Sequence, residues 1–172
     1  MAKRTIQQWF DLYGESHQNG TNKLIHWVCV PTIFFCVIGL LASIPPAESA
    51  YLGRIPWAKS VVAAVLLGFY LPRSLTLTAG MAVWSYACLA ISKYLQDHAT
   101  WPLWSICLAL FAAAWIGQFI GHRIEGRKPS FLTDLQFLLI GPAWLMGFIV
   151  TEAITTIRVL YSRMLVGEEE WK

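Results

Sequence analysis

The chain has 172 residues, of which 56% are hydrophobic and only 13% are charged. Together with a mean hydropathy of +0.52, this balance excludes an average soluble protein and predicts one integral membrane domain over residues 1–172. The net charge is only +3 and no Lys/Arg cluster alternates with aromatic residues, so the sequence predicts no binding to nucleic acid.

The N-terminal segment predicts an amphipathic helix over residues 5–17 that lies in a membrane interface. Its large apolar side chains recur at helical spacing and share one face: Ile6, Trp9, Phe10 and Tyr13. Lys3 and Arg4 precede them, but no apolar core or small-residue cleavage site follows. The segment therefore does not match a signal peptide.

Five apolar runs follow, at residues 24–44, 57–71, 75–95, 101–121 and 135–154. We expect a kink at Pro31 in the first run and a loop over residues 45–59. The second run is short for a span, and Pro72-Arg73-Ser74 separates it from the third. Joined, the two would far exceed the bilayer thickness, so we expect a hairpin of two spans.

The fourth run is the clearest span. Trp101 and Trp104 are typical interfacial anchors, and Gly117-x-x-x-Gly121 predicts a close-packing face for a neighbouring helix. The fifth run is interrupted by Gly141-Pro142, and an amphipathic tail follows from residue 158 to residue 172. The predicted fold is therefore an all-α polytopic membrane bundle with about four to five spans and an N-terminal interfacial helix.

The cysteines predict little about function. All four lie inside apolar runs and none forms a C-x-x-C pair, which is typical of small buried hydrophobic residues: Cys29, Cys36, Cys88 and Cys107.

The segment 13–31 contains the most informative pattern, because His17 and His26 stand at its change from polar to apolar. On one continuous helix, nine residues would rotate the second ring by about 180° and shift it roughly 13 Å along the axis. Asn19-Gly20 is a strong turn signal, however, and Thr21 and Asn22 are both good N-cap residues. A new helix capped by Asn22 would let both rings face one point.

Topology adds a third histidine. If the first four runs all span, the start of the first and the end of the fourth lie on the same side of the membrane, which brings His122 to His17 and His26. His98 lies 24 residues before His122, a separation of roughly 36 Å along a helix, so it cannot share an ion with it.

The cations indicate the side. Most of them fall at the histidine end, and the positive-inside rule marks that end as cytoplasmic: Lys3, Arg4, Lys23, Arg73, Arg123, Arg127 and Lys128. The opposite loops contain fewer, namely Arg54, Lys59 and Lys93.

The second motif is Gly121-His-Arg-Ile-Glu-Gly-Arg-Lys-Pro129, in which His122 and Glu125 share a helix face. Three imidazoles beside a carboxylate suit Fe(II) or Zn(II), and open positions at iron favour oxygen chemistry. Three roles remain open for Glu125. It could be a ligand, it could pair with Arg123 or Arg127, or it could orient His122 from outside the ligand set.

At these two motifs the sequence resembles the membrane-bound Fe(II)-dependent 2-hydroxy-fatty-acid dioxygenases. The matching stretches run from His17 to Pro31, from Gln118 through His122 and Glu125 to Pro129, and on to Gly141-Pro142. Two positions differ. Gly20 stands where members often have proline, and Glu125 lies one residue closer to the histidine than in many members.

The resemblance implies α-oxidation, in which O2 and a long-chain 2-hydroxy fatty acid yield CO2 and an acid one carbon shorter. It implies Fe(II) held by His17, His26 and His122, with Glu125 and Asn22 as candidate catalytic residues. It also implies the inner membrane of a bacterium or the endoplasmic reticulum of a eukaryote; in fungi the family serves breakdown of the phytosphingosine backbone. An interfacial site suits a substrate whose tail stays in the bilayer, and Lys23, Arg123 or Arg127 could attract its carboxylate.

Two other classes remain open. A membrane haem protein could use paired histidines as axial ligands, and a scaffold or transporter could bind a metal without catalysis or bind none. A zinc hydrolase is less attractive, because His122-Arg-Ile-Glu125 does not match His-Glu-x-x-His.

Overall fold

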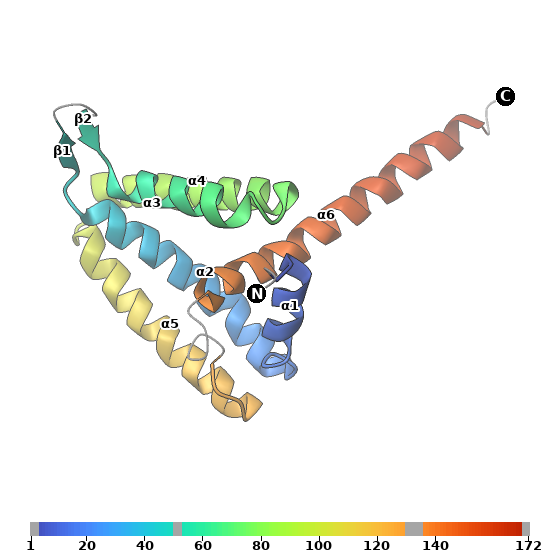
Figure 1. Ribbon diagram of the computed structural model, residues 1–172, viewed down its shortest axis with the longest axis horizontal. Coiled ribbons are helices and arrows are strands. Elements are labelled where there is room, and N and C mark those ends of the chain that lie inside the picture. Colours follow the sequence, from blue (N-terminus) through green and yellow to red (C-terminus); the bar gives the residue numbers. More distant parts are fainter. Residues whose placement is uncertain (1–3, 50–52, 130–135, 170–172) are drawn as a thin grey trace.

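The chain folds into helices, as the composition predicts. The computed structural model describes residues 4–49, 53–129 and 136–169, and side chains as far as residue 159 (Figure 1). Its α-helices are α1 (Ile6–Gly14), α2 (Gly20–Ser43), α3 (Trp57–Val65), α4 (Leu75–His98), α5 (Leu103–Glu125) and α6 (Phe137–Glu169). Among these residues, α2, α4, α5 and Phe137–Val159 of α6 are long and apolar enough to cross a membrane.

Helices α2 and α5 form the most extensive helix pair, and they run antiparallel (Figure 1). The predicted glycine face holds them together. A methyl group on Gly117 would lie 2.7 Å from Sγ of Cys29 on α2, and one on Gly121 would meet the side chain of Asn22 even more closely. Without side chains at these two positions, the helices approach closely enough to bring the start of α2 beside the end of α5.

The region between α2 and α4 differs from the expectation. Within the expected loop, β1 (Ala47–Ser49) pairs antiparallel with β2 (Gly53–Ile55). Helix α3 continues into a π-helical segment, η1 (Leu66–Tyr70), before the turn at Pro72. With nine and five residues, the two rise roughly 20 Å, less than the hydrocarbon thickness of about 30 Å. The hairpin is therefore confirmed, but its first arm is too short for a full span.

Helix α1 forms as predicted, but its apolar face packs on protein. Thr5 caps it in a capping box with Gln8. Trp9 and Tyr13 are buried against α6, and the Trp9 ring meets that of Phe137 edge-on at a centroid distance of 5.2 Å. The spacing identified the correct face, but the neighbour that covers it comes from the other end of the chain.

Helix α6 passes through Gly141-Pro142 without a break, so the predicted interruption is wrong. Residues 141–146 are all buried among α1, α2 and α4, and this packing holds the helix where proline removes one backbone hydrogen bond. Residues 151–159 are exposed, and Figure 1 shows the C-terminal half of α6 projecting from the other helices. The side chains of the predicted amphipathic tail lie outside the described residues from position 160 on.

The cysteines are free, as expected of small apolar residues. Cys36, Cys88 and Cys107 are buried and Cys29 is half-buried. Cys36 and Cys107 pack with Leu103 in an apolar cluster that joins α2 and α5 at the end opposite the histidines.

Candidate metal site

The turn between α1 and α2 places the first two histidines. The side chain of Asn19 accepts hydrogen bonds from the backbone N–H groups of Thr21 (2.9 Å) and Asn22 (3.3 Å), and the helix starts at Gly20. Asn19 is therefore the N-cap, and the assignment of that role to Asn22 is wrong. Because the chain changes direction at this turn, the ring of His26 lies next to the ring of His17.

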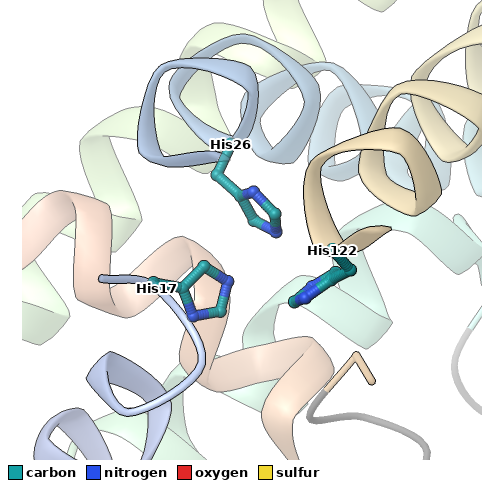
Figure 2. Close-up of side chains that lie close together, drawn as sticks. All are labelled: His17, His26 and His122. Carbon is teal, nitrogen blue, oxygen red and sulfur yellow. The ribbon is translucent and has the colours of Figure 1, made fainter. Parts of the chain in front are cut away.

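Three histidines converge where α2 begins and α5 ends. Figure 2 shows the rings of His17, His26 and His122 turned toward one common space. Ring centroids lie 4.3 Å apart for His17 and His26, 4.8 Å for His26 and His122, and 5.1 Å for His17 and His122. One ring nitrogen from each lies within 4.8 Å of the others, and the residues are 1%, 1% and 5% exposed in chain order. The three could hold one metal ion.

The hydrogen bonds of two rings determine which nitrogen is free. Nδ1 of His17 lies 2.6 Å from the carbonyl oxygen of Tyr13, and Nδ1 of His26 lies 2.9 Å from that of Asn22. A carbonyl oxygen only accepts, so each Nδ1 carries the hydrogen and each Nε2 keeps its lone pair.

One nitrogen of each ring remains without a hydrogen bond. Nε2 of His17, Nε2 of His26 and Nδ1 of His122 are buried without a hydrogen-bond partner among the described residues. Unpartnered buried nitrogens are costly, and a metal ion is the group that would satisfy them together. The donor set therefore fits a divalent transition-metal ion.

Tyr13 shapes the surroundings of His17. Its ring stacks on the imidazole at a centroid distance of 4.0 Å and an interplanar angle of 18°, and its carbonyl orients the ring. Burial, together with the neighbouring His26, lowers the pKa of His17 to about 3. The ring is therefore neutral at pH 7, the state in which a histidine binds metal.

Glu125 holds the turn between α1 and α2. Its carboxylate accepts hydrogen bonds from the backbone N–H of Gln18 (2.8 Å), the backbone N–H of Asn19 (2.9 Å) and Nδ2 of Asn22 (2.9 Å). Its carboxylate oxygens are not among the candidate ligand atoms that converge, which come from His17, His26 and His122. The three roles that the sequence left open stay predictions, and none of these hydrogen bonds corresponds to one of them. Glu125 instead fastens the segment between the two histidines to α5.

Asn22 links this fastening to a ligand candidate. It is fully buried, and its Nδ2 also donates to the carbonyl of Ser16 at 3.2 Å. Its own carbonyl orients His26, and its side chain fits against Gly121. One residue thus contacts the chain before His17, the helix that carries His26 and the helix that carries His122.

His98 lies apart, as expected. It is exposed at the end of α4, where its ring stacks on Tyr94 and its Nδ1 bonds the Tyr94 carbonyl at 2.9 Å. It is not part of the histidine group.

A cavity of about 340 Å³ adjoins the histidines. His122, Gln118 and Tyr13 line it, and the rest of its wall is mainly aliphatic and aromatic side chains from α2, α3, α5 and α6. Its volume lies in the range of small-molecule sites. Such a wall would accept a hydrocarbon chain and exclude water beside the histidines.

Comparison with known proteins identifies the family. A protein-family model described as 2-hydroxy-palmitic acid dioxygenase Mpo1-like matches residues 3–153. The chain belongs to this family. It is 33% identical over 143 residues to the 2-hydroxy-palmitic acid dioxygenase MPO1 of Saccharomyces cerevisiae, a match that covers 82% of this chain and 77% of the yeast protein. No solved structure matches the chain significantly.

This Mpo1-like chain has three residues near the histidines whose contacts the sequence did not predict, although Asn19 belonged to the predicted turn signal. Tyr13 had a visible signal, because it stands four residues before His17 and so one helical turn away. Asn19 is a good N-cap residue directly before the glycine. Gln118 stands one helical turn before His122, and its burial in the cavity wall was not predictable from spacing alone.

Proposed function

We propose that the protein is an Fe(II)-dependent dioxygenase that shortens 2-hydroxy fatty acids by one carbon. The reaction is R–CHOH–COOH + O2 → R–COOH + CO2 + H2O. The bond between carbons one and two breaks, the two carbons lose four electrons in total, and O2 accepts all four. No further reductant or oxidant is needed.

One observation supports this proposal above the others: three buried histidines, each with a ring nitrogen that lacks a hydrogen-bond partner among the described residues, converge beside an apolar cavity. His17, His26 and His122 would hold the metal ion. Bound iron would supply a one-electron redox change and open coordination positions, the basis of oxygen chemistry at such centres. The membership in a family of 2-hydroxy-palmitic acid dioxygenases supports the same reaction class.

The chain's own residues would prepare the site before substrate arrives. The carbonyls of Tyr13 and Asn22 hold two rings with their lone pairs directed inward. Glu125 and Asn22, proposed from the sequence as catalytic, would also act as positioning residues, a role that their hydrogen bonds in the turn between His17 and His26 support.

The substrate would lie with its polar head at the histidines and its tail in the cavity. Lys23 follows Asn22 on α2, and Arg123 and Arg127 flank Glu125, so positive charge gathers at this end of the helix pair. These cations would attract the carboxylate, while the apolar wall receives the tail. The histidine end would face the cytoplasm, in the inner membrane of a bacterium or the endoplasmic reticulum of a eukaryote.

The reaction is testable with purified protein. Anaerobic protein loaded with Fe(II) should consume O2 on addition of 2-hydroxyhexadecanoate and form pentadecanoate in equal amount. Substrate labelled with 13C at carbon one should release labelled CO2. Absence of turnover across a range of 2-hydroxy chain lengths, with iron verified as bound, would falsify the proposal.

The alternatives predict different spectra and metal contents. A haem protein would show an intense Soret band, whereas the three rings lie too close together to leave a macrocycle between any two of them. A non-catalytic metal protein would bind the ion and consume no O2, and a scaffold or transporter of another kind would bind none. Absorption spectra and metal analysis of detergent-purified protein separate these cases.

A further inference from the structure

The cavity is long rather than round, and helix α2 shows its length. Its lining residues on α2 are Val30, Ile33, Phe34, Val37, Ile38 and Leu41. They repeat at intervals of three and one, so they form a single stripe along the helix. From Val30 to Leu41 the stripe extends about 16 Å along the axis, and His26 lies one helical turn before it.

Helix α5 forms the facing wall. Phe111, Trp115, Gln118 and His122 line the cavity at intervals of one helical turn. Because α5 runs antiparallel to α2, His122 lies at the metal end, and Phe111 lies about 16 Å away, near the level of Val37. The cavity therefore leads from the histidines toward the opposite membrane surface.

The wall is not closed along its whole length. Three lining residues are exposed: Leu138 on α6 (45%), and, at the end far from the histidines, Val37 on α2 (44%) and Val61 on α3 (37%). Ile38, the neighbour of Val37 in the same wall, is 3% exposed. Helices α2 and α3 pack together, and each contributes one of these exposed valines to the cavity wall. In a membrane, such apolar side chains face lipid.

We propose that the cavity is an acyl channel with a side opening between Val37 and Val61, through which the end of a long chain enters the bilayer. This inference rests on the proposed function. In this proposal, the opening at these two valines controls which acyl-chain lengths the protein accepts, and the channel has no closed end. Chains too short to reach the opening then lie wholly inside the channel, and longer chains are tolerated because their ends leave it.

The distance to the opening gives the threshold. Val37 lies eleven residues beyond His26, about 16 Å along α2. An extended chain advances roughly 1.2 Å per bond, a third of the advance per residue of extended backbone. About 13 bonds therefore reach the opening, so a hexadecanoate chain just emerges and a tetracosanoate chain extends well into lipid.

Photolabelling tests the path without requiring turnover. Metal-loaded protein in lipid nanodiscs is irradiated with 2-hydroxy acids that carry a diazirine at the final carbon. A dodecanoate probe ends just short of the opening and should label the protein near Phe34, Phe111 or Val37, whereas a tetracosanoate probe should label mainly lipid. Labelling of protein by the long probe inside the cavity, or of residues 151–159 by either probe, would overturn the proposal.

Substitution tests the opening itself. Val37→Trp and Val61→Trp should each lower kcat/KM for 2-hydroxytetracosanoate at least tenfold more than for 2-hydroxydecanoate. Val83→Trp is the matched control, because Val83 is 72% exposed on α4 and does not line the cavity; it should leave the ratio of the two substrates unchanged. Equal losses for both substrates in the Val37 and Val61 variants would contradict a side opening. If no variant or parent turns over any substrate, the proposed function fails, and the labelling pattern still decides the channel.

Discussion

At each end of the α2–α5 pair, a glycine lets a side chain of the facing helix approach closely, but the two ends have different surroundings. At one end Gly121 lets Asn22 approach, and at the other Gly39 lets Cys107 approach. The second contact lies in a cluster of apolar and sulfur atoms with Cys36 and Leu103. The first lies among buried polar groups, several of which lack a hydrogen-bond partner among the described residues.

This difference between the two ends shows where the fold includes contacts that lower its stability. Each buried polar atom without a partner costs about 1–3 kcal/mol, and the far end shows that the helices can pair without a cluster of such atoms. The histidine end therefore has a cost that packing does not explain. A ligand that satisfies the ring nitrogens explains it.

The largest expected effect separates His98 from the other histidines. His17→Ala, His26→Ala and His122→Ala should each abolish stoichiometric iron binding and activity, because two imidazoles hold the ion far less well than three. His98→Ala should retain both, since its ring bonds only its own helix. Iron per protein and circular dichroism of the four variants measure this, and metal loss in a folded His98 variant would contradict the assigned ligand set.

A smaller effect is expected at the carboxylates. Glu125→Ala should weaken iron binding about 10–100-fold, because it releases the turn that positions two ligands. Asp97→Ala at the far end is the control. Asp97 forms an exposed ion pair with Lys93 on α4, a kind of contact worth about 0–1 kcal/mol. Metal titration should show no change in this control, and equal affinity in both variants would remove the positioning role of Glu125.

The glycines allow a direct comparison of the two ends. Gly121→Ala and Gly39→Ala each force a methyl group against a side chain of the facing helix, and each should lower the free energy of unfolding by about 1–3 kcal/mol. Only Gly121→Ala should also weaken iron binding, because it displaces Asn22. Denaturant titration in detergent and metal titration give the two quantities. A similar loss of iron affinity in Gly39→Ala would mean that the histidine end responds to stability alone.

The smallest effect concerns the helix start. Asn19→Ala should lower the free energy of unfolding by about 1 kcal/mol, the usual cost of a lost N-cap. Asn22→Ala should cost more and also reduce iron affinity, since Asn22 holds Glu125 and packs on Gly121. Denaturant and metal titrations of both variants measure this. A larger cost for Asn19→Ala than for Asn22→Ala would show that the cap, and not the contact with Glu125, dominates the turn.

The sequence could predict what short-range spacing controls. The helical fold, the α3–α4 hairpin and the close packing at Gly117 and Gly121 followed from apolar runs and residue intervals. The convergence of three histidines followed from one turn signal and from the side on which each span starts or ends. Their role as ligands stays a prediction.

The predictions from the sequence were wrong where contacts with distant segments of the chain determine the local structure. Pro142 does not break α6, because buried neighbours from three other helices hold that segment. The choice between Asn19 and Asn22 as cap changes the helix start by three residues. The side chain of Asn19 caps the helix, whereas that of Asn22 bonds Glu125, a contact that no local pattern encodes. The face of α1 was predicted, but not its partner, since α6 lies more than a hundred residues later.

The contact between Gln18 and Glu125 joins segments that are synthesised at different times. It joins residues separated by 107 positions, with α2, α3 and α4 between them in the chain. His17 and His26 leave the ribosome long before His122 does, so a nascent chain has only two of the three rings until α5 is in place. An ion held by all three rings, as proposed above, would therefore bind tightly only to a chain in which α5 has already paired with α2. Metal loading would then act as a checkpoint that distinguishes completed chains from partly inserted ones.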